Sequence, residues 1–489
     1  MGRPARKPEV PATPTNLAIR LANNSPLLAA DPTDSRFVVL ANRIDSPDFG
    51  CSLQISGDGG RSWLTADPVR TLPGGVDKCY GPEVAFDRDG LLYYLFVGLQ
   101  GRGNTPTGAF LTTSRDRGRT FSAPRKVLSG SNFQVRMALD RTRGDKGRLH
   151  LIWQHANSLR LGGFAAPGNP ILAAHSDDGG RTFSPPVQVS DPERRRAVAP
   201  ALALGPDGAV HVLYYDLRGD FRDYEGRKGP TWQGKWALVM ASSTDGGRRF
   251  RRGVVVDADV VPPERVMLIF TMPTPAVSTG PAGRVYVAWH DARNGDWDVF
   301  LRRSTDRGAT WSTPQRLNDD RRRNGRHQYL PRLSVAPGGR VDAIWYDRRG
   351  NVENRGNDVY HAYSTDGGAT FSPNLKLTSR DSDSEIGQVY EIPSALGPPL
   401  KKEFGSRIAL LAERSRTLAA WTDTSSTGRA PPSQDIHATE LVFASSGGDR
   451  GWLRVAGGAL ALAGLLALAA RYRGLLRRKA ATATGDADR

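Results

Sequence analysis

Cysteine is nearly absent from this chain of 489 residues, which contains only Cys51 and Cys79. Two cysteines are too few for a disulfide-rich scaffold or a cysteine-rich zinc site, although they can form a single bridge, which would fit an oxidising compartment. No group of histidines and cysteines has the spacing of metal ligands. We therefore expect no obligatory metal ion and no cofactor.

An apolar segment is also lacking at the start of the chain. Residues 1–14 (MGRPARKPEVPATP) contain no run of the kind that forms a secretory signal, and we expect them to be disordered. Either the true start lies upstream of Met1, or the protein is tail-anchored with its main domain in the cytoplasm. We prefer the first interpretation because of the charges near the C-terminus.

The C-terminal region contains one long apolar run, over residues 455–470. A helix from Trp452 to Tyr472 would span roughly 30 Å, enough to cross a bilayer. The basic residues around it are asymmetric: Arg450 and Arg454 precede it, and Arg471, Arg473, Arg477, Arg478 and Lys479 follow it. This pattern predicts a linker over 446–451, a transmembrane helix over 452–472 and a basic cytoplasmic tail over 473–489, with the rest of the chain extracytoplasmic at the cell membrane. A buried hydrophobic helix is the alternative.

The chain has fewer acidic than basic residues: 50 against 67, which gives a formal net charge of +17. Arginine triplets at 194–196 and 321–323 fall in predicted loops. A basic surface raises the local concentration of polyanions, so we expect an acidic glycan or another polyanion as a partner. The sequence contains no nucleic-acid-binding module, and we expect no nucleic acid as a partner.

What the chain does contain is a short pattern, Ser-x-Asp-x-Gly-x-x-(Trp/Phe), repeated six times. Its aspartates are separated by 58 to 67 residues and are Asp58, Asp116, Asp178, Asp245, Asp306 and Asp366. The pattern suits a hairpin turn, because the aspartate can accept hydrogen bonds from backbone N–H groups, the glycine can adopt a positive φ and the aromatic ring can be buried. The period is too long for a helical repeat and suits a four-stranded propeller blade.

The pattern is that of the Asp-box, or bacterial neuraminidase (BNR) repeat, and most of the chain resembles the sialidase-like β-propeller superfamily. The same box occurs in sortilin-type receptors, xyloglucanases and photosystem assembly factors, so the resemblance implies a fold rather than an activity. It also implies that the boxes mark one face of the propeller and that a ligand binds at the opposite face.

The strands between the boxes predict seven blades rather than six. A recurring inner strand begins near residues 26, 82, 135, 200, 275, 331 and 406. The last unit lacks a box and a fourth strand, which the segment 16–21 near the N-terminus can supply. We therefore predict an all-β, seven-bladed propeller of four-stranded antiparallel blades over residues 15–445, closed by its first strand. A six-bladed ring with an appendage is the alternative.

The second residues of the inner strands predict an anion site, because Arg136, Arg332 and Arg407 occupy this position in three blades and Glu83 in a fourth. Converging guanidinium groups bind carboxylate, sulfate or phosphate. In sialidases three arginines hold the substrate carboxylate, and the sequence around Arg407 is the nearest match to one of their motifs, without its aromatic residue and proline. The alternative is that these arginines pair with acidic side chains.

The chemistry of sialidases requires a tyrosine nucleophile that is activated by a glutamate. It also requires an aspartate that acts as general acid and base. The candidates are Tyr80 with Glu83 and Tyr390 with Glu391, none of which lies in a family motif. Whether the protein is an enzyme stays open. The sequence favours a membrane-anchored, extracytoplasmic propeller that binds an anionic or glycan ligand. The alternatives are an exo-α-sialidase-type glycoside hydrolase and a protein–protein interaction scaffold.

Overall fold

A computed structural model of the protein describes residues 8, 15–16, 22–45, 48–144, 146–156, 168–220, 232–262, 275–384, 405–425 and 434–443. They belong to one compact unit, Pro8–Val442, apart from Phe443. The predicted linker, transmembrane helix and tail, the first fourteen residues except Pro8, and Tyr390 and Glu391 lie outside the described residues. Among the helices of the described residues, none has the length and hydrophobicity needed to cross a membrane.

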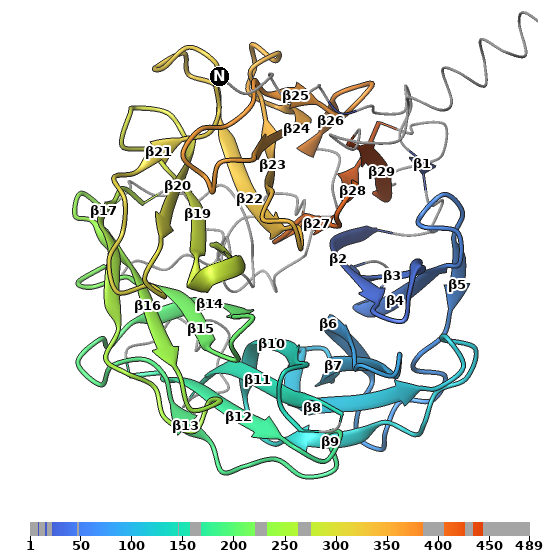
Figure 1. The fold of residues 1–489 in the computed structure, drawn as a ribbon. Helices are drawn as coiled ribbons and strands as arrows, with labels where there is room; N and C mark the ends of the chain where they lie inside the picture. Colours follow the sequence, from blue (N-terminus) through green and yellow to red (C-terminus); the bar gives the residue numbers. More distant parts are fainter. Residues whose placement is uncertain are drawn as a thin grey trace, which may run out of the picture. The chain divides into compact units, whose positions relative to one another are not determined.

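The unit is a β-propeller with seven antiparallel sheets arranged around a central axis (Figure 1). Blade 1 contains β2 (Asn23–Asp31), β3 (Asp34–Ile44), β4 (Gly50–Ser56) and β5 (Leu64–Ala66), and blade 2 contains β6 (Lys78–Phe86), β7 (Leu92–Gln100), β8 (Thr105–Ser114) and β9 (Arg125–Leu128). Blade 3 contains β10 (Asn132–Asp140), β11 (Arg148–His155), β12 (Ile171–Ser176) and β13 (Val187–Gln188), and blade 4 contains β14 (Ala197–Leu204), β15 (Val210–Asp216), β16 (Trp236–Ser243) and β17 (Val254–Val260).

The remaining blades follow the same order. Blade 5 contains β18 (Ala276–Thr279), β19 (Val285–Asp291), β20 (Asp298–Ser304) and β21 (Gln315–Arg316), with the short 3₁₀ turn η2 (Pro281–Gly283) after its first strand. Blade 6 contains β22 (Gln328–Val335), β23 (Val341–Asp347), β24 (Gly356–Ser364) and β25 (Leu375–Lys376), and β26 (Ser382–Asp383) also pairs with β24. The prediction of seven four-stranded blades is confirmed, and the six-bladed alternative is wrong.

The last blade combines the two ends of the described chain. Strands β27 (Ala409–Ala412), β28 (Arg416–Asp423) and β29 (Asp435–Val442) are joined by β1 (Thr15–Asn16), which pairs antiparallel with β29. The edge of β29 is therefore covered by the start of the propeller, and the ring is closed by backbone hydrogen bonds.

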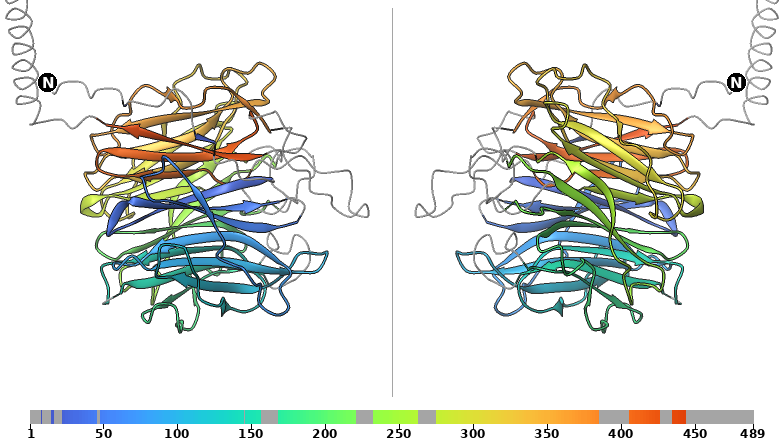
Figure 2. Two further views of the ribbon diagram at one scale, coloured as in Figure 1. Left: turned by 90° about the vertical axis from the view of Figure 1, so that its right-hand side faces the viewer. Right: turned by 90° about the vertical axis from the view of Figure 1, so that its left-hand side faces the viewer.

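The second strand of each blade lies between neighbouring blades and is buried on both faces. In β7, for example, eight of the nine residues are buried, and the sequence is correspondingly apolar and aromatic. Figure 2 shows the strands running from one face of the propeller to the other. The central residues of each strand therefore belong to the cores between blades, and the loops at the strand ends form the two faces.

The six boxes form the turns between the third and fourth strands of blades 1 to 6. In each, the serine hydroxyl donates to the aspartate Oδ1 over 2.6–2.8 Å and accepts the N–H of the following glycine over 2.7–2.8 Å. In blade 2 the hydroxyl and N–H groups of Thr120 hold the pKa of Asp116 down to about 2. The carboxylates of the boxes thus accept hydrogen bonds from groups of their own turns.

Arginines join several blades to the box of the next blade. Arg416 donates to the carbonyl of Gly59 over 2.7 Å, and Arg148 donates to that of Gly246 over 2.8 Å. Arg303 likewise donates a hydrogen bond to the carbonyl of Gly367, and Arg125 donates one to the carbonyl of Gly180. Part of the positive charge of the sequence therefore stabilises the contacts between blades.

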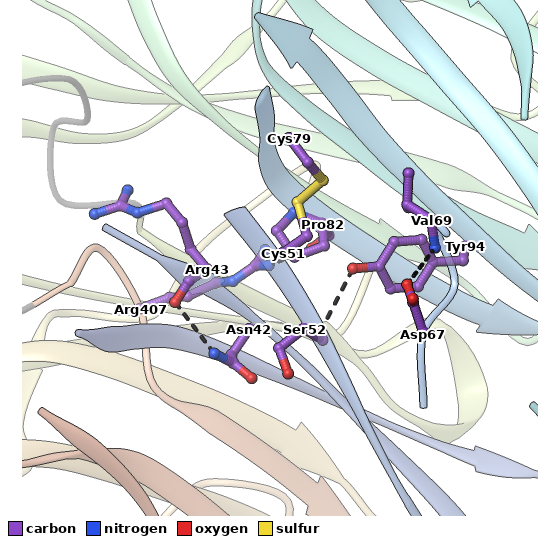
Figure 3. The surroundings of a disulfide bond; sticks show 10 residues. All are labelled: Asn42, Arg43, Cys51, Ser52, Asp67, Val69, Cys79, Pro82, Tyr94 and Arg407. Atoms are coloured by element: carbon purple, nitrogen blue, oxygen red, sulfur yellow. Dashed lines mark hydrogen bonds between the residues drawn. A yellow bond between two sulfur atoms is a disulfide. The ribbon is translucent and has the colours of Figure 1, made fainter. Parts of the chain in front are cut away.

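A disulfide joins Cys51 of β4 to Cys79 of β6 and so links blade 1 to blade 2 (Figure 3). The two Cα atoms are 5.6 Å apart, a separation that suits a disulfide. The bridge lies at the beginning of β6, the strand that contains Tyr80 and Glu83.

Candidate functional site

A bulge in the first strand turns one side chain of a blade toward the axis. The register of the first and second strands shifts in blades 1, 2, 3, 4 and 6, and each shift contains a residue with left-handed φ. These residues are Ser25 (55°), Gly81 (58°), Gln134 (51°), Ala199 (56°) and Leu330 (50°). A non-glycine residue in this conformation costs about 1–2 kcal/mol, and bulges of this kind re-aim side chains beside binding sites.

The residues that follow the bulges line a cavity on the axis of the propeller. Its empty volume is about 700 Å³, which includes solvent at its opening, and its charged lining residues are Glu83, Arg136, Arg332 and Arg407. The structure thus brings together the three arginines and the glutamate that the sequence places at equivalent positions. Blade 5 contributes Pro275 and Val277, because Ala276 is buried in the core between blades.

Glu83 is held by groups from two other blades. Arg407 forms an ion pair with its Oε1, and Nη1 of Arg136 lies 3.5 Å from the same oxygen. The N–H of Met137 donates to Oε2 over 3.3 Å. Arg407 also donates to the carbonyls of Ser25 and Pro82, over 3.2 and 2.7 Å. Both oxygens of Glu83 are therefore engaged, and the carboxylate compensates one positive charge.

Arg332 makes no hydrogen bond or ion pair with any other described residue, and its Nε is buried without an acceptor. Burial, together with the positive charges of Arg407 and Arg136, lowers the pKa of Arg332 to about 10. Three guanidinium groups therefore face one carboxylate in the cavity. This excess of positive charge favours an anion beside Arg332.

Tyr80 lies in the bulged end of β6 and contacts a different group from Glu83. Its hydroxyl accepts a hydrogen bond from Nη1 of Arg43 over 2.8 Å. Arg43 in turn makes a bidentate ion pair with Asp45, at 2.6 and 2.8 Å, and Asn24 donates to the same carboxylate over 2.6 Å. The geometry thus orients Tyr80 through Arg43. The second candidate pair, Tyr390 and Glu391, lies outside the described residues.

The loop arginines that the sequence marks as a basic surface divide into two groups. Arg194 forms ion pairs with Asp191 and Asp216, at 2.8 and 2.9 Å, and Arg196 is buried. The residues of the second triplet, 321–323, are exposed. Arg194 and Arg196 are therefore part of the fold, whereas Arg195 and the second triplet provide charge at the surface.

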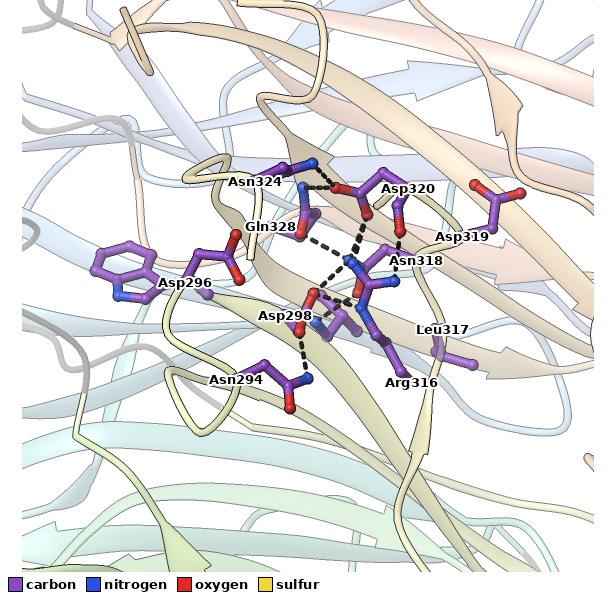
Figure 4. A network of polar contacts seen from close by, with 12 residues as sticks. Asn294, Asp296, Asp298, Arg316, Leu317, Asn318, Asp319, Asp320, Asn324 and Gln328 are labelled. Carbon is purple, nitrogen blue, oxygen red and sulfur yellow. Dashed lines mark hydrogen bonds and ion pairs between the residues drawn. The ribbon is translucent and has the colours of Figure 1, made fainter. Parts of the chain in front are cut away.

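A separate polar network lies between blades 5 and 6 (Figure 4). Arg316 donates to Asp298 over 2.5 Å and to Asp320 over 2.8 Å, and Asn318 donates to Asp298 over 2.7 Å. These contacts compensate the charge of Asp298 at the start of β20 and hold Asp320 beside it. Across the part of the chain that the structure describes, no group of three or more His, Cys, Asp or Glu residues could hold a metal ion.

Sequence reasoning misses the Arg43–Asp45–Asn24 contacts, because no pattern connects these positions to the axis. The bulges carry a weak signal: a proline directly precedes the cavity-lining residue in several blades, as in Pro82-Glu83 and Pro331-Arg332. Proline inside a strand indicates an edge or a bulge. That Arg332 has no partner among the described residues carries no sequence signal, since it depends on side chains from all the blades around it.

Seven blades of antiparallel strands define the class of the protein as a β-propeller. No model of a known protein family matches the sequence, and no curated protein matches it. Solved structures that are similar to the chain include a protein of unknown function from Dyadobacter fermentans, with 13% identity and a TM-score of 0.48, over 90% of this chain and all of that one.

Two enzymes are also among the similar structures. An ulvan lyase has 13% identity and a TM-score of 0.48, over 88% of this chain and 96% of its own. A Hadza microbial sialidase has 14% identity and a TM-score of 0.43, over 84% of this chain and 74% of its own. At these identities the likeness concerns the fold alone, and no activity is carried over from these proteins.

Proposed function

We propose that the propeller binds an anionic group in its central cavity, where Arg332 is the principal contact and Arg136 and Arg407 supply further positive charge. The observation that carries this proposal is the guanidinium of Arg332, which lines the cavity without an acidic partner among the described residues. A carboxylate, sulfate or phosphate offers the oxygens that its planar fork of donors requires. An acidic glycan is one carrier of such a group.

We further propose that the propeller is extracytoplasmic and is anchored in the cell membrane by residues 452–472. The apolar run and the excess of basic residues after it support this topology, as does the Cys51–Cys79 disulfide, which fits an oxidising compartment. Protease added to intact cells should cut the propeller. A propeller that is cut only after lysis would contradict the topology.

Isothermal titration of the full chain with sodium sulfate and with N-acetylneuraminate, at constant ionic strength, tests the anion site. Loss of a charge-assisted hydrogen bond costs about 1.5–3 kcal/mol, so Arg332→Met should weaken binding of both probes by roughly 10- to 100-fold. The matched control is Arg322→Met, which removes an exposed arginine of a loop and should leave binding unchanged. Equal binding by the wild type and Arg332→Met would refute the proposal.

A fluorogenic sialoside assay separates binding from hydrolysis. We expect no turnover, because Glu83 contacts Arg407, Arg136 and Met137 whereas the hydroxyl of Tyr80 contacts Arg43, so the described contacts do not pair this glutamate with this tyrosine. Turnover by the wild type that is lost in Arg332→Met would instead identify the sialidase-type glycoside hydrolase.

A further inference from the structure

The part of the cavity wall between Arg136 and Arg332 is apolar. In the ring, blades 4 and 5 lie between blade 3, which carries Arg136, and blade 6, which carries Arg332. Blade 4 lines the cavity with Ala201 and Leu202, and blade 5 lines it with Pro275 and Val277. An anion bound at Arg332 therefore has hydrocarbon next to it on this side.

The cavity offers few acceptors to a ligand that carries hydroxyl groups. Both oxygens of Glu83 already accept hydrogen bonds, and the guanidinium groups of the three arginines are donors only. Among the described lining residues, one carries a side-chain hydroxyl: Ser406, whose hydroxyl is 3.2 Å from that of Ser25. A sugar hydroxyl can accept a hydrogen bond from an arginine. The side chains of Ala201, Leu202, Pro275 and Val277 offer it no hydrogen-bond partner, which disfavours a sugar ring against this part of the wall.

We infer that the ligand is a small carboxylic acid with an apolar body, an inference that rests on the proposed anion site. The carboxylate lies at Arg332, and the apolar body lies against Ala201 and Val277. The small side chain of Ala201 leaves room for the body, and its burial adds affinity in proportion to the apolar surface removed from water. The same wall discriminates against acidic sugars of similar charge.

The test is a titration of the full chain with sodium sulfate, acetate, butyrate, hexanoate and glucuronate at constant ionic strength. Each methylene buried against the wall should tighten binding by up to about fourfold. Hexanoate should therefore bind more tightly than butyrate and acetate, and glucuronate should bind no more tightly than acetate. Glucuronate that binds as tightly as hexanoate would overturn the inference.

Variants of the apolar wall test whether the dependence of affinity on chain length arises there. Ala201→Leu enlarges a side chain that lines the cavity, so it should remove the advantage of hexanoate over acetate while binding of acetate and sulfate persists. Ala123→Leu, at an exposed position in a turn of blade 2, is the matched control and should behave as the wild type. If Ala201→Leu does not fold, Val277→Thr keeps the shape of the side chain and should weaken hexanoate several-fold without affecting acetate.

The pattern of outcomes separates the two proposals. If sulfate, acetate and hexanoate all fail to bind, the anion site itself is wrong. If the anions bind through Arg332 but their affinity is independent of chain length, the anion site stands and the apolar ligand class is wrong. Loss of acetate and sulfate binding in a folded Ala201→Leu variant would also contradict the placement of the apolar body.

Discussion

Arg136 and Arg407 both contact Glu83 in the cavity. Arg332 differs from them, because its guanidinium has no acceptor among the described residues. A buried donor without a partner costs about 1–3 kcal/mol of stability. The same feature that suits an anion therefore destabilises the empty protein. Binding of an anion should offset this cost by the mass action of a ligand that binds only the folded state.

Replacing Arg332 by methionine should stabilise the protein in the absence of ligand. Methionine keeps much of the volume of the side chain and removes the uncompensated charge, so the free energy of unfolding should rise by about 1–3 kcal/mol. Chemical denaturation in a chloride buffer measures this change. An unfolding free energy that falls would show that Arg332 has a structural partner.

Arg407→Met should have the opposite effect. Its ion pair with Glu83 is almost completely buried, and loss of one partner of such a pair leaves an uncompensated carboxylate. We expect a loss of about 3 kcal/mol in the free energy of unfolding, measured in the same buffer. Similar values for Arg332→Met and Arg407→Met would contradict the assignment of different roles to these residues.

The boxes act at the level of the element, where each aspartate is held in its charged form by its own turn. In blade 5 the hydroxyl groups of Ser304 and Thr310 hold the pKa of Asp306 down to about 2, below its usual value near 4. Because the pKa is lower in the folded state, the stabilisation is present above about pH 4 and is lost as the pH falls toward 2.

Acid should therefore lower the free energy of unfolding of the propeller as the pH falls from about 4 toward 2. Urea denaturation followed by circular dichroism at several pH values measures this change. Asp306→Asn removes one titrating group, so the variant should be less stable at pH 7, and its difference from the wild type should shrink as the pH approaches 2. A difference that is independent of pH would contradict the role of the carboxylate charge.

The disulfide is the covalent link between two blades. The separation of Cys51 and Cys79 by 28 residues corresponds to about 3–4 kcal/mol of stabilisation through restriction of the unfolded chain. We expect the double variant Cys51→Ser, Cys79→Ser to lose about this amount in the free energy of unfolding. Urea denaturation of the variant, compared with the wild type under non-reducing conditions, measures it; equal midpoints would contradict a stabilising role.

At the scale of the whole propeller, the sequence predicts the blades because each blade repeats a local pattern. The spacing of the boxes and the seven inner strands are readable in short segments, and the seven-bladed architecture follows from them. The contacts between blades are not local: Arg148 reaches the carbonyl of Gly246, and Arg407 reaches Glu83. Such contacts depend on the closed ring, so no sequence pattern predicts that Arg332 lacks an acidic partner in the part of the chain that the structure describes.

The central claim is that the cavity on the axis holds an anion at Arg332. Anomalous diffraction from crystals soaked in selenate, an analogue of sulfate, locates bound anions directly. We predict an anomalous peak in the central cavity, with selenate oxygens within about 3 Å of the guanidinium of Arg332, and its loss in Arg332→Met. Anomalous peaks confined to surface arginines, with none in the cavity, would contradict the claim.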